Sequence, residues 1–206
     1  MTRLLWLLVP AALNRRFLPC EDSARAFSLG ALLGHSEAPS EEDLTCIGSR
    51  QVFGSTEGIF AVESSRCRHG FPRAFVRLPV TSKVSSGMLR LSCPFLVKAI
   101  DEWEANGGIE EVNAALHESE DLQASFVQTN QAWQEIRRNS VSPEQKEYVS
   151  SIIGAKGLLN FMDSGIIGVS QNKTDDVKCI HAHVADYLIR GGMYLVEMGL
   201  VYVTFL

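Results

Sequence analysis

At Met88-Leu-Arg-Leu-Ser-Cys-Pro-Phe-Leu96 the hydrophobic pattern of the chain changes from the period of a strand to that of a helix. Before this stretch, Gly58 to Glu63 is a short apolar run and Ala74 to Val80 alternates along its length, as strands do. After it, Pro94 suits the first position of a helix, and three large apolar residues follow at helical spacing: Leu96, Ile100 and Trp103. Strands followed by helices predict an α+β fold.

We expect a small, mostly antiparallel sheet of three or four strands, followed by about five helices. Asn106-Gly107-Gly108 is predicted to end the first of these helices, and Ser142-Pro143-Glu144-Gln145 is a capping box that opens a later one. The last helix is predicted to be capped by Thr174 and to end at Gly191-Gly192.

The composition of the 206 residues, 46% apolar and 21% charged, is that of an ordinary globular domain. We expect one α+β domain over residues 46–192, preceded by a polar linker from His35 to Asp43. A net charge of −5 gives no basic footprint, so nucleic acid is not an expected partner. The five cysteines are irregularly spaced, which favours a reducing compartment over a disulfide scaffold.

The two ends of the chain differ from this domain. Residues 1–45 are expected to be a leader or a disordered extension, because Leu4 to Leu13 matches the apolar region of a signal sequence and is too short to span a bilayer. Ala24-Arg25-Ala26 before Phe27 is similar to the cleavage region of bipartite plastid leaders, so we expect the protein to be located in an organelle. The alternative is a cytoplasmic protein whose start was mis-assigned and which is not processed. Residues 193–206 form an atypical apolar tail that either pairs with the sheet or comes from a mis-predicted exon.

The chemistry of the chain is concentrated in Lys178-Cys179-Ile180-His181-Ala182-His183. On a helix, Cys179, His183 and Asp186 would share one face, and His181 would point the opposite way. Two further cysteines stand at special points: Cys67 precedes a turn, and Cys93 precedes a helix start, where the dipole favours a thiolate. We therefore predict a zinc site with four ligands: Cys67, Cys93, Cys179 and His183. The three cysteines alone can instead hold an iron–sulfur cluster.

Two functions are compatible with such a site. In an enzyme, zinc would activate a water for metal-assisted hydrolysis, with three candidates for proton transfer: His181, Asp186 and His69. The basic residues around Cys67 would then bind an anionic small molecule, with Arg66, Arg68 and Arg73 as candidates. In a non-catalytic structural or adaptor protein, the same cysteines and histidines would form a closed metal site or pack in the core.

Three motifs together resemble the domain of unknown function 501 family. They are Arg66-Cys67-x-x-Gly70-x-Pro72, Cys93-Pro94 at a helix start, and the run from Lys178 to His183 followed by Val-Ala-x-Tyr-Leu. The resemblance covers about Gly48 to Gly192. The family occurs widely in bacteria and in some algae and plants, and it implies no established activity. Some members carry His at the Cys93 position, which favours zinc over a cluster, and the usual Gly-Gly-Asn-Pro-like segment is replaced here by Gly191-Gly192-Met193-Tyr194.

Overall fold

The computed structural model describes residues 33–51, 54–85, 87–166 and 176–191. Residues 1–32 of the predicted leader or extension, Thr174 and the apolar tail lie outside the described residues. None of the described helices combines the length and the apolar character needed to cross a membrane.

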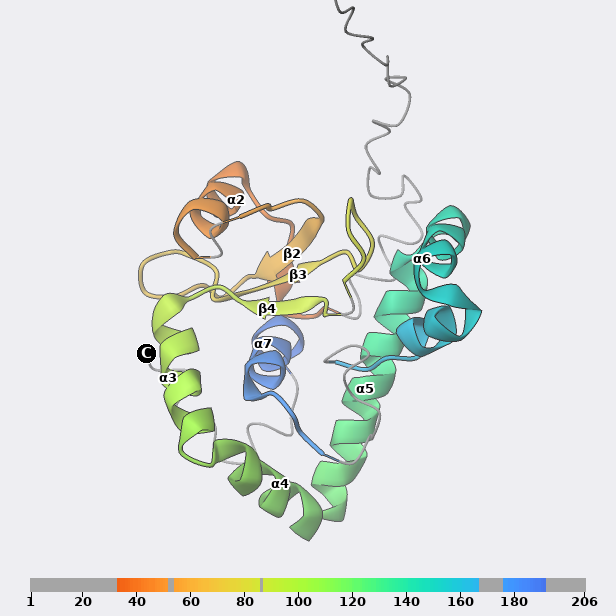
Figure 1. Ribbon diagram of the computed structural model, residues 1–206. Coiled ribbons are helices and arrows are strands. Elements are labelled where there is room, and N and C mark those ends of the chain that lie inside the picture. The colour runs from red at the N-terminus through yellow and green to blue at the C-terminus, as the bar shows by residue number, and fades with distance from the viewer. Residues whose placement is uncertain (1–32, 52–53, 86, 167–175, 192–206) are drawn as a thin grey trace, which may run out of the picture.

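A four-stranded antiparallel sheet forms one layer of the molecule, with the strands in the order β1-β2-β3-β4 (Figure 1). The strands are β1 (Ser36–Glu37), β2 (Ile59–Glu63), β3 (Ala74–Arg77) and β4 (Leu89–Leu91). In their register Val62 pairs with Phe75, and Phe75 pairs with Arg90. The small antiparallel sheet predicted from the alternating runs is confirmed.

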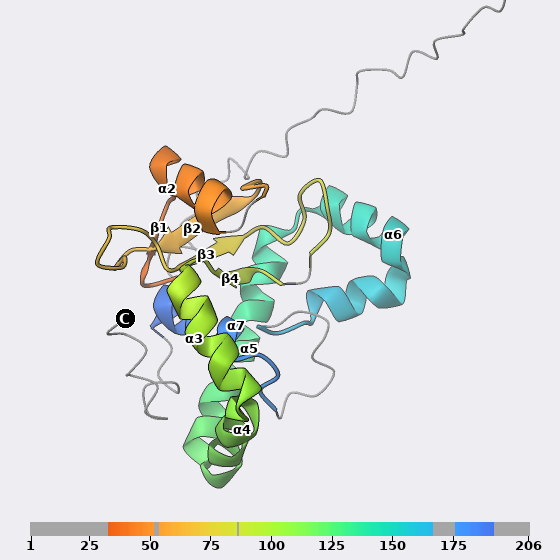
Figure 2. The same cartoon turned by 60° about the vertical axis from the view of Figure 1, so that its left-hand side comes forward.

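Five helices follow the sheet in the described part of the chain, as predicted. They are α3 (Pro94–Ala105), α4 (Gly108–Glu118), α5 (Glu120–Ser140), α6 (Pro143–Met162) and α7 (Ile180–Arg190). Helix α7 packs against β3, β4 and α3, and Figures 1 and 2 show it enclosed between the sheet and the arc of α3, α4 and α5. The arrangement is therefore α+β, with α7 as its central helix.

The main core lies around α7. Its apolar side chains face the sheet and the long helix α5, and the buried residues there include Val184, Ala185, Leu188, Phe126 and Trp133. Burial of large apolar side chains contributes about 1.5–3 kcal/mol each to folding, so this cluster is the main source of stability.

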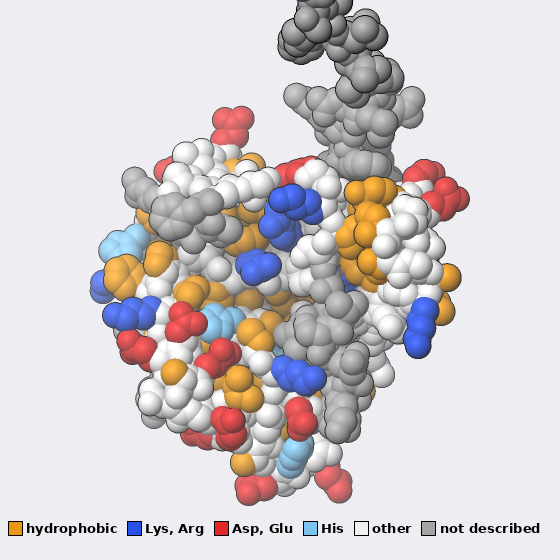
Figure 3. Space-filling view, in the orientation of Figure 1, with side chains coloured by type: hydrophobic (Ala, Val, Ile, Leu, Met, Phe, Trp, Pro, Cys, Tyr) orange, Lys and Arg blue, Asp and Glu red, His pale blue; other side chains and the backbone are white. Residues whose placement is uncertain are grey.

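Helix α6 packs over a second, smaller apolar cluster that includes Val149 and Phe161. Its capping box is confirmed, because the Ser142 hydroxyl accepts the Gln145 N–H and the Gln145 side chain accepts the Ser142 N–H. The helix is interrupted at Gly154, where φ is 74°. The helix exposes four large apolar side chains: Tyr148, Ile152, Ile153 and Leu159. Apolar surface is visible at the right of the space-filling view, where α6 lies (Figure 3).

The segment from His35 to Asp43 is ordered structure, whereas the sequence predicted a linker there. Ser36–Glu37 pairs with β2, and Ser40 caps helix α2 (Glu41–Cys46), which continues into a short π-helix, η1 (Ile47–Gln51). The polar residues of this segment serve the cap: the Ser40 hydroxyl accepts the Asp43 N–H at 3.1 Å, and the Asp43 carboxylate accepts the Ser40 N–H at 2.9 Å.

Helix α7 ends where the sequence predicted and begins later. Gly191, with φ 74°, adopts the left-handed conformation of a C-terminal glycine. The helix starts at Ile180, and Cys179 is the N-cap residue in an extended conformation with φ −155° and ψ 110°. Cys179 is thus outside the helix, and this changes which side chains it can meet.

Candidate metal centre

The last turn of α3 meets the start of α7, and three side chains that can ligate a metal converge there. A carboxylate oxygen of Glu104, the sulfur of Cys179 and a ring nitrogen of His181 all lie within 4.8 Å of one another, and each residue is half-buried. Among the residues that the structure describes, no other group of three or more His, Cys, Asp and Glu side chains is so close. Sulfur, nitrogen and oxygen donors together suit a tetrahedral ion such as zinc.

The Glu104 carboxylate is held in place by the start of α7. Its Oε1 accepts the Ile180 N–H at 2.5 Å and lies 3.2 Å from His181 Nδ1. The first amides of a helix have no intrahelical acceptor, and the helix dipole favours negative charge at this end. Cys179 itself makes no side-chain cap bond, so Glu104 supplies the cap from another helix.

His181 lies between acidic groups on both sides of its ring. Its Nε2 is 3.2 Å from Asp101 Oδ1, and its Nδ1 faces Glu104. The hydrogen bond with Cys179, together with the charge of Glu104, raises the pKa of His181 to about 9. Without a metal, the ring is therefore protonated at neutral pH and forms ion pairs with these carboxylates.

The structure does not bring the four predicted ligands together. Cys93 is the N-cap of α3, while Glu104, next to Cys179, is in the last turn of the same helix. At 1.5 Å per residue these two ends are about 16 Å apart along the helix axis. Cys67 lies in a turn closed by the Gly70 N–H, which donates to the Cys67 carbonyl at 2.8 Å.

His183 and Asp186 share one face of α7, as predicted, but that face is buried against α5. His183 is 1% exposed, its ring packs 5.6 Å from that of Phe126, and burial lowers its pKa to about 3. Asp186 is fully buried; its Oδ1 accepts bonds from Trp133 Nε1 at 2.6 Å and Arg190 Nε at 2.5 Å, and burial raises its pKa. Neither residue joins the cluster at Cys179.

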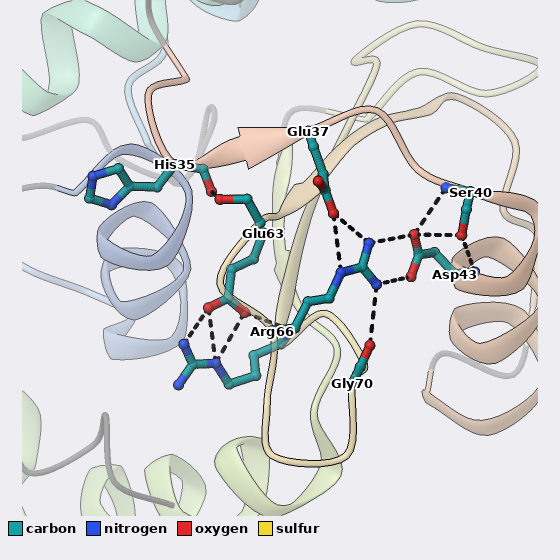
Figure 4. A network of polar contacts seen from close by, with 9 residues as sticks. His35, Glu37, Ser40, Asp43, Glu63, Arg66 and Gly70 are labelled. Atoms are coloured by element: carbon teal, nitrogen blue, oxygen red, sulfur yellow. Dashed lines mark hydrogen bonds and ion pairs between the residues drawn. The ribbon is translucent and has the colours of Figure 1, made fainter.

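Arg66, predicted to bind substrate, joins the N-terminal segment to the sheet (Figure 4). Its guanidinium donates to Glu37 and Asp43 at 2.5 Å each and to the Gly70 carbonyl at 3.3 Å. The hydrogen bond from Arg66 is the main reason that the pKa of Asp43 is lowered to about 2. The backbone of Arg66 has φ 51°, a left-handed conformation that is uncommon for arginine and is maintained here by these contacts.

Arg73, a second predicted substrate-binding residue, pairs with the fully buried Glu63. Arg73 Nε donates to both carboxylate oxygens at 3.0 Å, and its terminal nitrogen also forms an ion pair with Glu63. This hydrogen bonding raises the pKa of Arg73. The structure thus gives Arg66 and Arg73 carboxylate partners within the chain.

The third predicted arginine and the remaining histidine candidate lie together at the surface. Arg68 Nε donates to His69 Nε2 at 3.2 Å, next to the Cys67 turn. Neither side chain belongs to the Glu104 cluster.

These features define an α+β protein with a mixed Glu/Cys/His cluster at the junction of two helices. A family model described as protein of unknown function (DUF501) matches residues 63–197, more than half of the chain, and the chain belongs to that family. The resemblance carried by the Cys67 and Cys179 motifs is therefore confirmed. No curated protein and no solved structure matches the chain. The matched range begins at the last residue of β2 and includes the whole cluster, whereas β1 and α2 precede it.

Sequence reasoning did not find Glu104 and Asp101. Both are acidic residues of the first long helix, three positions apart, and such pairs usually lie on solvated helix faces. Their role depends on the packing of α3 against α7, which no local pattern reveals.

Proposed function

We propose that the protein binds zinc through Glu104, Cys179 and His181. The observation that carries this proposal is the convergence of one oxygen, one sulfur and one nitrogen ligand within 4.8 Å. Two ligands held about 2.0 Å from a tetrahedral zinc ion are roughly 3.3 Å apart. The separation of 3.2 Å between Glu104 Oε1 and His181 Nδ1 fits that value.

Asp101 supports the same interpretation. A histidine that ligates a metal through one nitrogen usually donates the other N–H to a carboxylate, which fixes the orientation of the ring. With Nδ1 toward the metal, Nε2–H of His181 is directed to Asp101 at 3.2 Å. Asp101 would then orient the ligand without touching the ion.

Three protein ligands leave one position of a tetrahedral ion for water, as in catalytic zinc sites. Zinc lowers the pKa of a bound water and so supplies a nucleophile at neutral pH, and the reaction class that we propose is metal-assisted hydrolysis. The partial exposure of all three ligands is consistent with solvent access to this position.

The same residues support a second candidate function, hydrolysis by a cysteine nucleophile. Cys179 is hydrogen-bonded to His181, and His181 Nε2 lies 3.2 Å from Asp101, so the three residues could act as a Cys-His-Asp triad. In that case the metal-free protein would react with an alkylating agent at Cys179, and His181→Ala would slow the reaction strongly.

The test of zinc binding is an affinity measurement on anaerobically purified protein. Cys179→Ser, His181→Ala and Glu104→Gln should each weaken zinc binding by at least about tenfold, because a first ligand matters at least as much as the second-shell groups whose loss costs 10–100-fold. Cys67→Ser and Cys93→Ser are the matched controls and should bind like the wild type. Equal affinity of Cys179→Ser and wild type would refute the proposal.

An open site differs from a closed structural site in its response to small anions. In the cobalt-substituted protein, azide should displace the bound water and change the visible absorption spectrum. An unchanged spectrum at saturating azide would contradict hydrolysis and favour the structural or adaptor function.

A further inference from the structure

The segment that precedes α7 is held by a side-chain amide of α4. Asn113 Nδ2 donates to the Val177 carbonyl at 2.9 Å, and Asn113 Oδ1 accepts the Val177 N–H at 2.7 Å. One side chain therefore satisfies both backbone polar groups of one residue, as a neighbouring strand would. Val177 is 1% exposed, and the two bonds are partly buried.

The conformation of this segment determines which side chain enters the cluster. Val177 is buried, Lys178 is exposed, and Cys179 is half-buried, the alternation expected of extended chain. A slip of one residue in such a segment turns its side chains to the opposite side. Lys178 or Ile180 would then occupy the place of the Cys179 sulfur.

We propose that Asn113 is a positioning residue that sets the register of Cys179 in the cluster; as a role in metal binding, this rests on the function proposed above. The bonds to Val177 fix the backbone two residues before Cys179, and the Glu104 carboxylate fixes the Ile180 N–H directly after it. The backbone on either side of Cys179 is thus held by side chains of two different helices, α4 and α3.

A neighbouring contact serves as an internal comparison. His117, one turn further along α4, pairs with Asp176 at 2.9 Å, but their side chains are 54% and 41% exposed. Exposed ion pairs of this kind contribute little. The partly buried amide of Asn113, which bonds the buried Val177, should therefore carry the positioning, and His117 should not.

The experiment compares Asn113→Ala with Val112→Ala and His117→Ala in the full-length protein by two measurements. The first is Co²⁺ affinity, with the thiolate-to-cobalt absorption band as its signature. The second is the rate at which iodoacetamide alkylates Cys179 in the metal-free protein, followed on the Cys179 peptide by mass spectrometry. Val112 is buried on the same helix, so Val112→Ala reports destabilisation without loss of the amide bonds.

Asn113→Ala should weaken Co²⁺ binding by about tenfold or more and diminish the thiolate band. Iodoacetamide should also alkylate Cys179 several-fold faster in this variant than in the wild type. Val112→Ala and His117→Ala should stay within about twofold of the wild type in both Co²⁺ affinity and alkylation rate. Unchanged alkylation and affinity in Asn113→Ala, or equal changes in Val112→Ala, would overturn the positioning role. A wild type that binds no Co²⁺, combined with faster alkylation of Asn113→Ala alone, would refute the metal site and retain the positioning role.

Discussion

Replacing Asp43 by Asn should destabilise the protein by about 2 kcal/mol at pH 7. The pKa of Asp43 falls from 3.8 to about 2 in the folded protein, chiefly through the hydrogen bond from Arg66, and each unit of pKa corresponds to about 1.4 kcal/mol. The side chain is 2% exposed, so solvent screens this interaction little. Asn retains an oxygen that can accept the Ser40 N–H, and the substitution therefore removes mainly the charge.

The direction of the pH dependence follows from the lowered pKa. The unfolded chain binds a proton at Asp43 near pH 4, and the folded protein binds it only near pH 2. The stabilisation is therefore complete at neutral pH and is lost as the pH falls from about 4 to 2. Asp43→Asn should lack this part of the acid destabilisation, so the two proteins should approach equal stability near pH 2.

Urea unfolding followed by tryptophan fluorescence at a series of pH values measures both quantities. Asp163→Asn is the matched control, because its ion pair with Arg138 at 2.6 Å joins side chains that are 60% and 54% exposed; it should cost less than about 1 kcal/mol. If Asp43→Asn matches the wild type at pH 7, or differs from it equally at all pH values, the Arg66 network does not fix the N-terminal segment.

Two other substitutions test buried polar contacts by urea unfolding at pH 7. Trp133→Phe removes the donor to Asp186 and should cost about 1–3 kcal/mol, because a buried carboxylate oxygen loses a hydrogen bond; a change below about 0.5 kcal/mol would show that the contact is unimportant. Glu63→Gln leaves Arg73 without its counter-charge and should lower the free energy of unfolding by about 3 kcal/mol or more. An unchanged free energy of unfolding would mean that the ion pair does not stabilise the fold.

Local signals predicted much of the fold. The change of period at Cys93-Pro94, the Ser142 capping box and the glycine stop at Gly191 each depend on residues adjacent in sequence, and each is found in the structure. The start of α7 was predicted wrongly, at Thr174, because the true cap at Ile180 comes from Glu104, 76 residues away in sequence.

The N-terminal segment shows the same limit. Its polar composition is typical of a linker, and a two-residue strand gives no periodic signal. What orders it is the contact of Arg66 with Glu37 and Asp43, 29 and 23 residues away. Long-range ion pairs of this kind cannot be inferred from one sequence.

For the candidate site, the motif was found and its partners were not. Cys179 and His181 come from the stretch that the sequence singled out, but helical spacing assigned Cys179 to the face of His183. That rule applies only inside a helix, and Cys179 is an extended N-cap residue. The sequence could therefore indicate where the chemistry lies, while the choice of ligands required the packing of α3 against α7.

X-ray absorption at the zinc edge of the metal-loaded protein tests the central claim most directly. Binding by Glu104, Cys179 and His181 predicts one sulfur neighbour at about 2.3 Å and three nitrogen or oxygen neighbours at about 2.0 Å, the fourth being water. Three sulfur neighbours would instead indicate the set Cys67, Cys93 and Cys179, and no sulfur neighbour would exclude Cys179; either result would contradict the site proposed here.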